Sequence, residues 1–96
     1  MVIGEAYAQS QTITGVVKDQ TGEPLIGVNV MEKGTTNGSI TDVDGKYSLT
    51  VNGSKAIVTF SYIGYLSQDI TVGNQKMIDV TMKEDTEELE EVVVIG

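Results

Sequence analysis

The 96-residue chain has no cysteine, histidine or tryptophan, and it has a single proline. Without cysteine there is no disulfide, and there is no thiolate to act as a nucleophile or metal ligand. Without histidine the chain lacks the commonest general base at neutral pH, so Ser-His-Asp and Cys-His catalysis are excluded. No clustered serine–lysine or paired-carboxylate arrangement stands in for them. We therefore expect a protein that is not an enzyme and that holds no metal or cofactor.

Positive charge is also scarce, because the chain has six lysines and no arginine. The formal net charge is −8, and six of the fourteen acidic residues lie between positions 84 and 91. The rest of the chain is nearly neutral, with eight acids against six lysines. No basic stripe is present to meet phosphates, so nucleic-acid binding is not expected. No apolar run approaches the roughly 20 residues that span a bilayer.

Strand-like patterns run through the body of the chain. Lys46–Val51 alternates apolar and polar residues, and Ala56–Ile63 is rich in β-branched and aromatic residues. Asn52-Gly53 between these runs predicts a tight hairpin turn. The other strands are expected at Thr12–Lys18, Leu25–Lys33, Ser39–Thr41, Tyr65–Val72 and Lys76–Lys83.

Seven short strands with turn residues between them predict an all-β fold, a small seven-stranded antiparallel Greek-key sandwich with flexible N- and C-terminal tails. Gly15, Gly27 and Gly64 interrupt these strands and are expected to mark bulges or close backbone approach. The residues expected in the core are Val17, Val28, Val30, Tyr47, Leu49, Phe60 and Val80.

The two ends of the chain differ from its body. Residues 1–10 are expected to be a signal-peptide remnant or a disordered segment, because Ala6-Tyr7-Ala8 has the small-x-small pattern of a signal-peptidase site. Glu84–Glu91 is strongly acidic and is interpreted as a solvated linker. Val92–Ile95 is wholly apolar and β-branched. Composition leaves two interpretations open for it, an edge strand of this domain or a segment that adds a strand to a partner's sheet.

Several motifs occur together in a fixed order. They are Ile13-x-Gly15-x-Val17, Gly22-Glu23-Pro24-Leu25-Ile26-Gly27-Val28-Asn29-Val30, Lys33-Gly34-Thr35, Thr41-Asp42-Val43-Asp44-Gly45-Lys46-Tyr47, Phe60-Ser61-Tyr62-Ile63-Gly64-Tyr65 and Glu90-Glu91-Val92-Val93-Val94-Ile95-Gly96. Over residues 11–96 the chain resembles the carboxypeptidase-regulatory-like domain. In particular it is similar to the version at the N-terminus of SusC/RagA-family TonB-dependent outer-membrane transporters of Bacteroidetes.

This resemblance implies a transthyretin/immunoglobulin-like sandwich over residues 11–83, at the periplasmic face of the outer membrane. It also implies a linker and TonB-contacting segment over residues 84–96. The partners implied are the TonB C-terminal domain, engaged by strand addition at Glu91, Val92, Val93, Val94 and Ile95, and the plug and barrel of a parent transporter of glycans or peptides. No direct small-molecule ligand is implied.

Two further patterns are compatible with either a binding role or a purely structural one. Asp42-Val43-Asp44-Gly45 begins like a calcium loop, but the later acidic ligands are absent, so a turn is expected. Tyr62 and Tyr65 are expected to pack in the core and sheet, the alternative being a sugar-stacking platform. That alternative would make the chain a stand-alone carbohydrate- or surface-binding module. An assembly or regulatory role is not separable from the transporter role by sequence.

Overall fold

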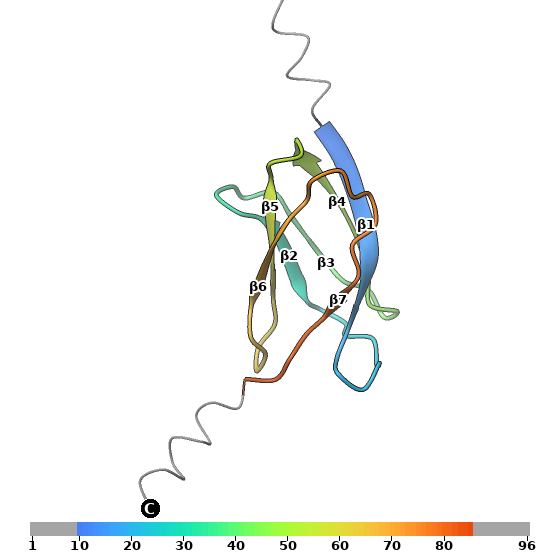
Figure 1. Cartoon of the computed structure of the whole chain (residues 1–96). Helices are drawn as coiled ribbons and strands as arrows, with labels where there is room; N and C mark the ends of the chain where they lie inside the picture. Colours follow the sequence, from blue (N-terminus) through green and yellow to red (C-terminus); the bar gives the residue numbers. More distant parts are fainter. Residues whose placement is uncertain (1–9, 86–96) are drawn as a thin grey trace, which may run out of the picture.

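The computed structural model describes residues 10–85, which form seven strands in two sheets. The first sheet has the order β4-β1-β7 and consists of β1 (Ser10–Lys18), β4 (Lys46–Asn52) and β7 (Val80–Thr81). The second has the order β3-β2-β5-β6 and consists of β2 (Asn29–Glu32), β3 (Gly38–Ile40), β5 (Ile57–Ser61) and β6 (Gln68–Thr71). The sheets face each other as a sandwich (Figure 1), which confirms the predicted all-β class. No helix long and apolar enough to cross a membrane occurs among residues 10–85.

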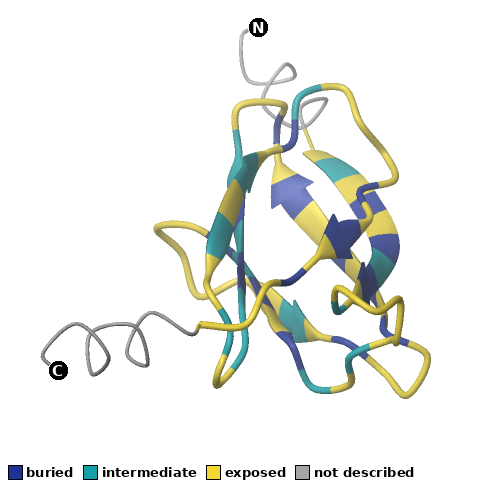
Figure 2. Ribbon diagram, turned by 60° about the horizontal axis from the view of Figure 1, so that its bottom comes forward, coloured by how far each residue is buried: buried dark blue, intermediate teal, exposed yellow. Residues whose placement is uncertain are grey.

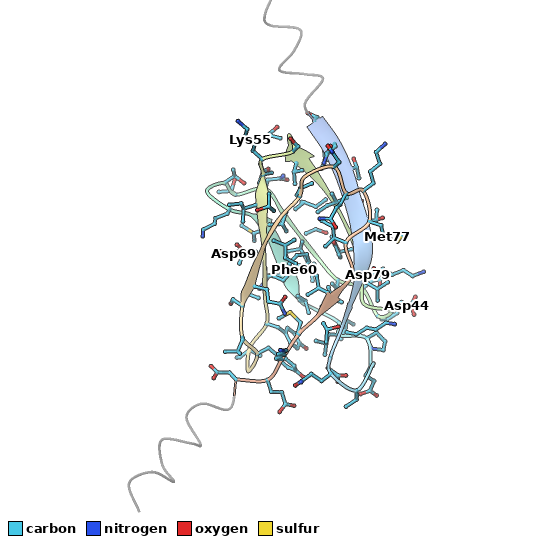
Figure 3. All side chains as sticks on the ribbon, in the orientation of Figure 1. Asp44, Lys55, Phe60, Asp69, Met77 and Asp79 are labelled. Carbon is cyan, nitrogen blue, oxygen red and sulfur yellow. The ribbon has the colours of Figure 1, made fainter. Side chains whose placement is uncertain are left out.

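The core lies between the two sheets and follows from the alternation in the sequence. Along β4 every second side chain is buried, and Figure 2 shows the same alternation on β1. Phe60 is fully buried and lies between the sheets (Figure 3). Its ring packs edge-on against that of Tyr47, with the two ring centroids 5.3 Å apart. All seven residues expected in the core are buried, together with Ile13, Val51, Val58, Val72, Ile78 and Met82.

The prediction of a hairpin between β4 and β5 is wrong, because the two strands lie in different sheets. β4 pairs antiparallel with β1, from Ser10↔Asn52 to Val16↔Lys46, whereas β5 pairs with β2 and β6. The connection after Asn52 therefore crosses the sandwich. A type I′ hairpin turn needs positive φ at both central residues. Only Gly53 has it here, with φ 103°.

Four predicted strands are shorter in the structure. Lys76–Lys83 is reduced to Val80–Thr81 and Ala56–Ile63 to Ile57–Ser61, and the other two begin later than predicted. The strand predicted over Leu25–Lys33 begins only at Asn29, because Gly27 has φ 88° and breaks the extended backbone. Ile26 is consequently 53% exposed instead of facing the core. The strand predicted from Tyr65 begins at Gln68, which leaves Leu66 outside it and 40% exposed.

One strand pair departs from the antiparallel expectation. β7 runs parallel to β1, with Val17↔Val80 and Lys18↔Thr81 in register. Ile78, Val80 and Met82 nevertheless point into the core, as their alternation predicts. Because β6 and β7 belong to different sheets, the chain crosses the sandwich once more before its last described residues.

Candidate functional site

The residues expected to contact TonB, Glu91 to Ile95, lie outside the described residues. The structure does describe the point from which the chain proceeds toward them. Met82 is fully buried in the core after β7. The Leu66 N–H donates to the Lys83 carbonyl at 2.8 Å, and the Asp85 N–H donates to the Gly64 carbonyl at 3.0 Å.

These bonds give Glu84 and Asp85, the first two residues of the expected linker, a short antiparallel pairing with the β5–β6 connection, centred on the Tyr65↔Glu84 bridge. The Gln68 side-chain amide adds a bond to the Thr81 carbonyl at 2.6 Å. Figure 1 shows the described chain ending beside the β5–β6 connection, at the opposite end of the sandwich from the start of β1. Glu84 and Asp85, the last described residues, are therefore held against the β5–β6 connection.

The surface around this exit combines aromatic, aliphatic and acidic residues. The Tyr62 and Tyr65 rings lie 5.5 Å apart, tilted by 43°, and both pack partly against the core, which is the packing role expected of them. Ile63, between them in sequence, is 91% exposed. Partial burial raises the pKa of the Tyr65 phenol, with the carboxylates of Glu84 and Asp19 adding to the shift. The sequence patterns did not predict this grouping, because it depends on the pairing of Glu84 and Asp85 with the β5–β6 connection.

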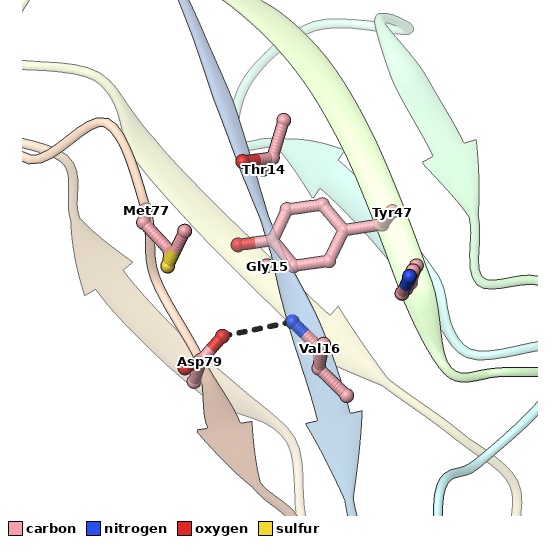
Figure 4. A pocket seen from close by; sticks show the side chains of 7 residues that line it. Thr14, Gly15, Val16, Tyr47, Met77 and Asp79 are labelled. Atoms are coloured by element: carbon pink, nitrogen blue, oxygen red, sulfur yellow. Dashed lines mark hydrogen bonds between the residues drawn. The ribbon is translucent and has the colours of Figure 1, made fainter.

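A second feature is an interruption in the ladder between β1 and the segment leading into β7. The ladder begins normally, since the Thr14 N–H donates to the Lys76 carbonyl at 3.0 Å and the Ile78 N–H donates to the Thr14 carbonyl at 2.8 Å. The next two backbone groups along the ladder, the Ile78 carbonyl and the Val16 N–H, bond to side chains and not to each other. The Ile78 carbonyl accepts from the Tyr47 hydroxyl at 2.6 Å, and the Val16 N–H donates to Asp79 Oδ1 at 3.0 Å (Figure 4). Two side chains thus satisfy the backbone groups where the ladder opens.

Gly15 makes this arrangement possible. A Cβ atom at this position would overlap the Ile78 carbonyl oxygen and come within 3.0 Å of Tyr47 Cε1. The prediction that Gly15 marks close backbone approach is therefore confirmed. Burial, with a smaller contribution from the Asp79 charge, raises the pKa of Tyr47 to about 12, so its hydroxyl remains a donor at neutral pH.

A surface hollow of about 370 Å³ opens at this interruption. Thr14, Val16, Lys46 and Met77 border it together with the residues of the interruption (Figure 4). The Tyr47 hydroxyl and Asp79 Oδ1, which are polar groups at its wall, already have partners within the chain. The hollow is thus explained by the strand geometry around Gly15.

The Asp42 motif forms a turn. Asp42 Oδ1 accepts from the backbone N–H groups of Asp44 and Lys46, each at 2.9 Å. These bonds, the one from Lys46 first, lower the pKa of the Asp42 carboxyl below its usual 3.8. Asp19 caps the turn after β1 in the same way, accepting from Thr21 and Glu23, and its pKa is also lowered. Across residues 10–85 no group of three or more potential metal ligands gathers.

Comparison with known proteins connects this fold to one family. The profile of the CarboxypepD_reg-like domain matches residues 13–94. The chain is 52% identical over 92 residues to the TonB-dependent receptor SusC of Bacteroides thetaiotaomicron, and 46% identical over 94 residues to the TonB-dependent receptor P39 of Formosa agariphila. These matches cover 96% and 98% of this chain but 9% of each relative. The chain therefore spans about a tenth of the length of the receptors it matches.

Solved structures give the same architecture at lower identity. Two mutant type II cohesin–X-dockerin complexes from Acetivibrio cellulolyticus contain chains of similar fold. One has a TM-score of 0.62 at 20% identity over 86% of this chain and 72% of that chain. The other has a TM-score of 0.61 at 21% identity over 77% and 58%. At such identities the likeness shows the sandwich fold alone.

Proposed function

This chain belongs to the CarboxypepD_reg-like domain family, and we propose on that premise that it is the N-terminal, non-catalytic accessory domain of a SusC-type TonB-dependent outer-membrane transporter. The observation that carries the proposal is the 52% identity to the receptor SusC across 96% of this chain. The position of the domain is the periplasmic face of the outer membrane. The transported nutrient, a glycan or peptide, is bound by the plug and barrel of the parent protein.

The missing residue types support a non-catalytic role. A chain without histidine or cysteine offers no Ser-His-Asp or Cys-His machinery. Within residues 10–85, the side chains of Tyr47, Asp42 and Asp19 are engaged in hydrogen bonds to backbone groups of the fold. The function of such a domain lies in what it presents to other proteins.

The segment it presents is Glu91–Ile95, which contacts the TonB C-terminal domain by strand addition. Four β-branched apolar residues in sequence suit an added strand, because main-chain hydrogen bonds supply affinity and side chains fill alternate pockets. The preceding acidic residues oppose pairing between copies of the segment. Glu84 and Asp85, through which the chain proceeds toward this segment, are held at one end of the sandwich by their pairing with the β5–β6 connection.

Binding of the TonB C-terminal domain to three versions of the chain tests this mechanism. Val93→Pro removes a ladder donor and fixes φ, so we expect binding to weaken by about tenfold or more. Val93→Thr keeps the N–H and the β-branched shape and serves as the matched control, with near-unchanged affinity. Equal binding by the wild type and Val93→Pro would rule out strand addition at this segment. Far-UV circular dichroism would verify that both variants keep the sandwich.

A further inference from the structure

We infer that the end of the sandwich from which the chain leaves is a docking surface for the domain that follows in the same receptor polypeptide. This surface, called here the exit face, consists of Ile26, Tyr62, Ile63, Tyr65 and Leu66. The inference rests on the proposed function only in requiring that a further receptor domain follows this one.

The exit face is an apolar patch assembled from two connections. Ile63 is 91% exposed, Ile26 53% and Leu66 40%. The Tyr62 ring links the two connections, because its centroid lies 5.5 Å from that of Tyr65 and its Cε1 atom lies 3.7 Å from where a Cβ on Gly27 would stand. Figure 1 shows the β1–β2 and β5–β6 connections at the same end of the sandwich. Single exposed apolar residues are ordinary, whereas five on two connections at one end of the domain form an apolar surface that a partner can cover.

Acidic side chains border the patch. Glu84 is bridged to Tyr65 through the backbone, and the carboxylates of Glu84, Asp19 and Glu23 all contribute to the raised pKa of the Tyr65 phenol. Their negative charge disfavours pairing with a second copy of the same face, since like charges would meet. The complementary surface is apolar at its centre and carries lysine or arginine at its edge.

The size of the patch favours a tethered partner over a free one. Five partly exposed side chains offer at most a few hundred Å², whereas a stable complex between free proteins buries roughly 1,000 Å² or more. A partner joined by a covalent linker needs a much smaller interface, because the linker raises its effective concentration at the exit face to the millimolar range. The described chain ends on this face, and residues 86–96 span at most roughly 36–40 Å when fully extended. In a receptor of SusC's length, the part of the polypeptide that follows is thus tethered to this face.

Thiol labelling can test the docking, because the chain has no cysteine of its own. Ile63→Cys introduces a thiol at the most exposed residue of the exit face, and Met77→Cys, at a residue 68% exposed beside β1 (Figure 3), is the matched control. The maleimide reaction rate of each is measured in the 96-residue chain and in the full-length receptor, with the labelled peptide identified by mass spectrometry. We expect Ile63→Cys to react at least tenfold more slowly in the receptor, with Met77→Cys reacting equally in both.

A second variant tests whether the patch itself provides the protection. Adding Leu66→Asp should restore fast labelling of Ile63→Cys in the receptor, because a carboxylate is costly to bury against an apolar surface. Equal labelling of Ile63→Cys in both proteins would overturn the inference while leaving TonB binding by Glu91–Ile95 intact. Labelling that slows with concentration in the 96-residue chain alone would also overturn it, since a second copy would then cover the face. An open reading frame after Gly96 that encodes no plug or barrel would refute the proposed function itself.

Discussion

Gly15→Ala is the substitution that this structure predicts to be most informative about the fold. The added Cβ would overlap the Ile78 carbonyl oxygen and press on the Tyr47 ring. The obstacle is backbone, so it cannot swing away as a flexible side chain would. The segment leading into β7 must therefore move off β1, and the 2.6 Å bond from the Tyr47 hydroxyl to Ile78 is lost or weakened.

The size of the effect follows from three contributions. Forcing an extra methyl group into a packed site costs about 1–3 kcal/mol. Losing the hydrogen bond to Ile78 costs about 1 kcal/mol more. The reduced freedom of the unfolded chain on replacing Gly15 offsets about 0.4–1 kcal/mol of this. We expect a net loss of about 1–3.5 kcal/mol, a large share of the roughly 5–15 kcal/mol that stabilises a typical domain.

Urea unfolding followed by far-UV circular dichroism measures this loss. The matched control is Gly38→Ala, because Gly38 also lies in a strand without positive φ. The atom closest to its added Cβ is the sulfur of Met31, at the far end of a flexible side chain. The control should lose less than about 1 kcal/mol. A Gly15→Ala variant as stable as Gly38→Ala would refute the explanation given for the interrupted ladder.

Two further perturbations test the core and the turns. Phe60→Ala should cost on the order of 3–5 kcal/mol in a urea melt, because Phe60 is fully buried and packs edge-on against Tyr47; a loss below about 1 kcal/mol would remove Phe60 from the core. Asp19 and Asp42 have folded pKa values below 3.8, so their stabilisation is present above the unfolded pKa and is lost as the pH falls through the folded one. Between pH 5 and pH 2 the Asp42→Asn variant should lose less stability than the wild type, and identical acid profiles would contradict the capping role.

The sequence predicts which side of each strand faces the core but not which sheet the strand joins. Alternation in Lys46–Val51 and Ala56–Ile63 correctly identified Tyr47 and Leu49 on β4 and Phe60 on β5 as core residues. The same alternation occurs whether two successive strands form a hairpin or lie in different sheets. The local sequence therefore could not predict that β4 pairs with β1. Ile26 alternates with Val28 and Val30 in the sequence, but the backbone turns at Gly27 and the extended structure does not reach Ile26, which is exposed for that reason.

Buried polar contacts were the other feature beyond the reach of sequence patterns. Glu32 is only 5% exposed at the end of β2, where its carboxylate accepts from the Asn37 side chain at 3.0 Å and the Asn52 N–H at 3.3 Å. Asn37 also donates to the Thr50 carbonyl at 2.6 Å, which joins the β2–β3 turn to β4 in the other sheet. The alternation of β2 directs Glu32 inward, so the local sequence was enough to predict that it is buried. Its hydrogen-bond partners could not be predicted, because they come from other parts of the chain.

The most direct test of the proposed function is amide hydrogen exchange over residues 91–95, measured with and without the TonB C-terminal domain. Strand addition predicts that alternate amides between Val92 and Ile95 become protected when the partner is present, since every second N–H of an added strand enters the ladder. Amides within β4 and β5 should keep the same rates in both samples and report that the sandwich is intact. Unchanged exchange from Val92 to Ile95 in a sample saturated with the TonB domain would contradict the account.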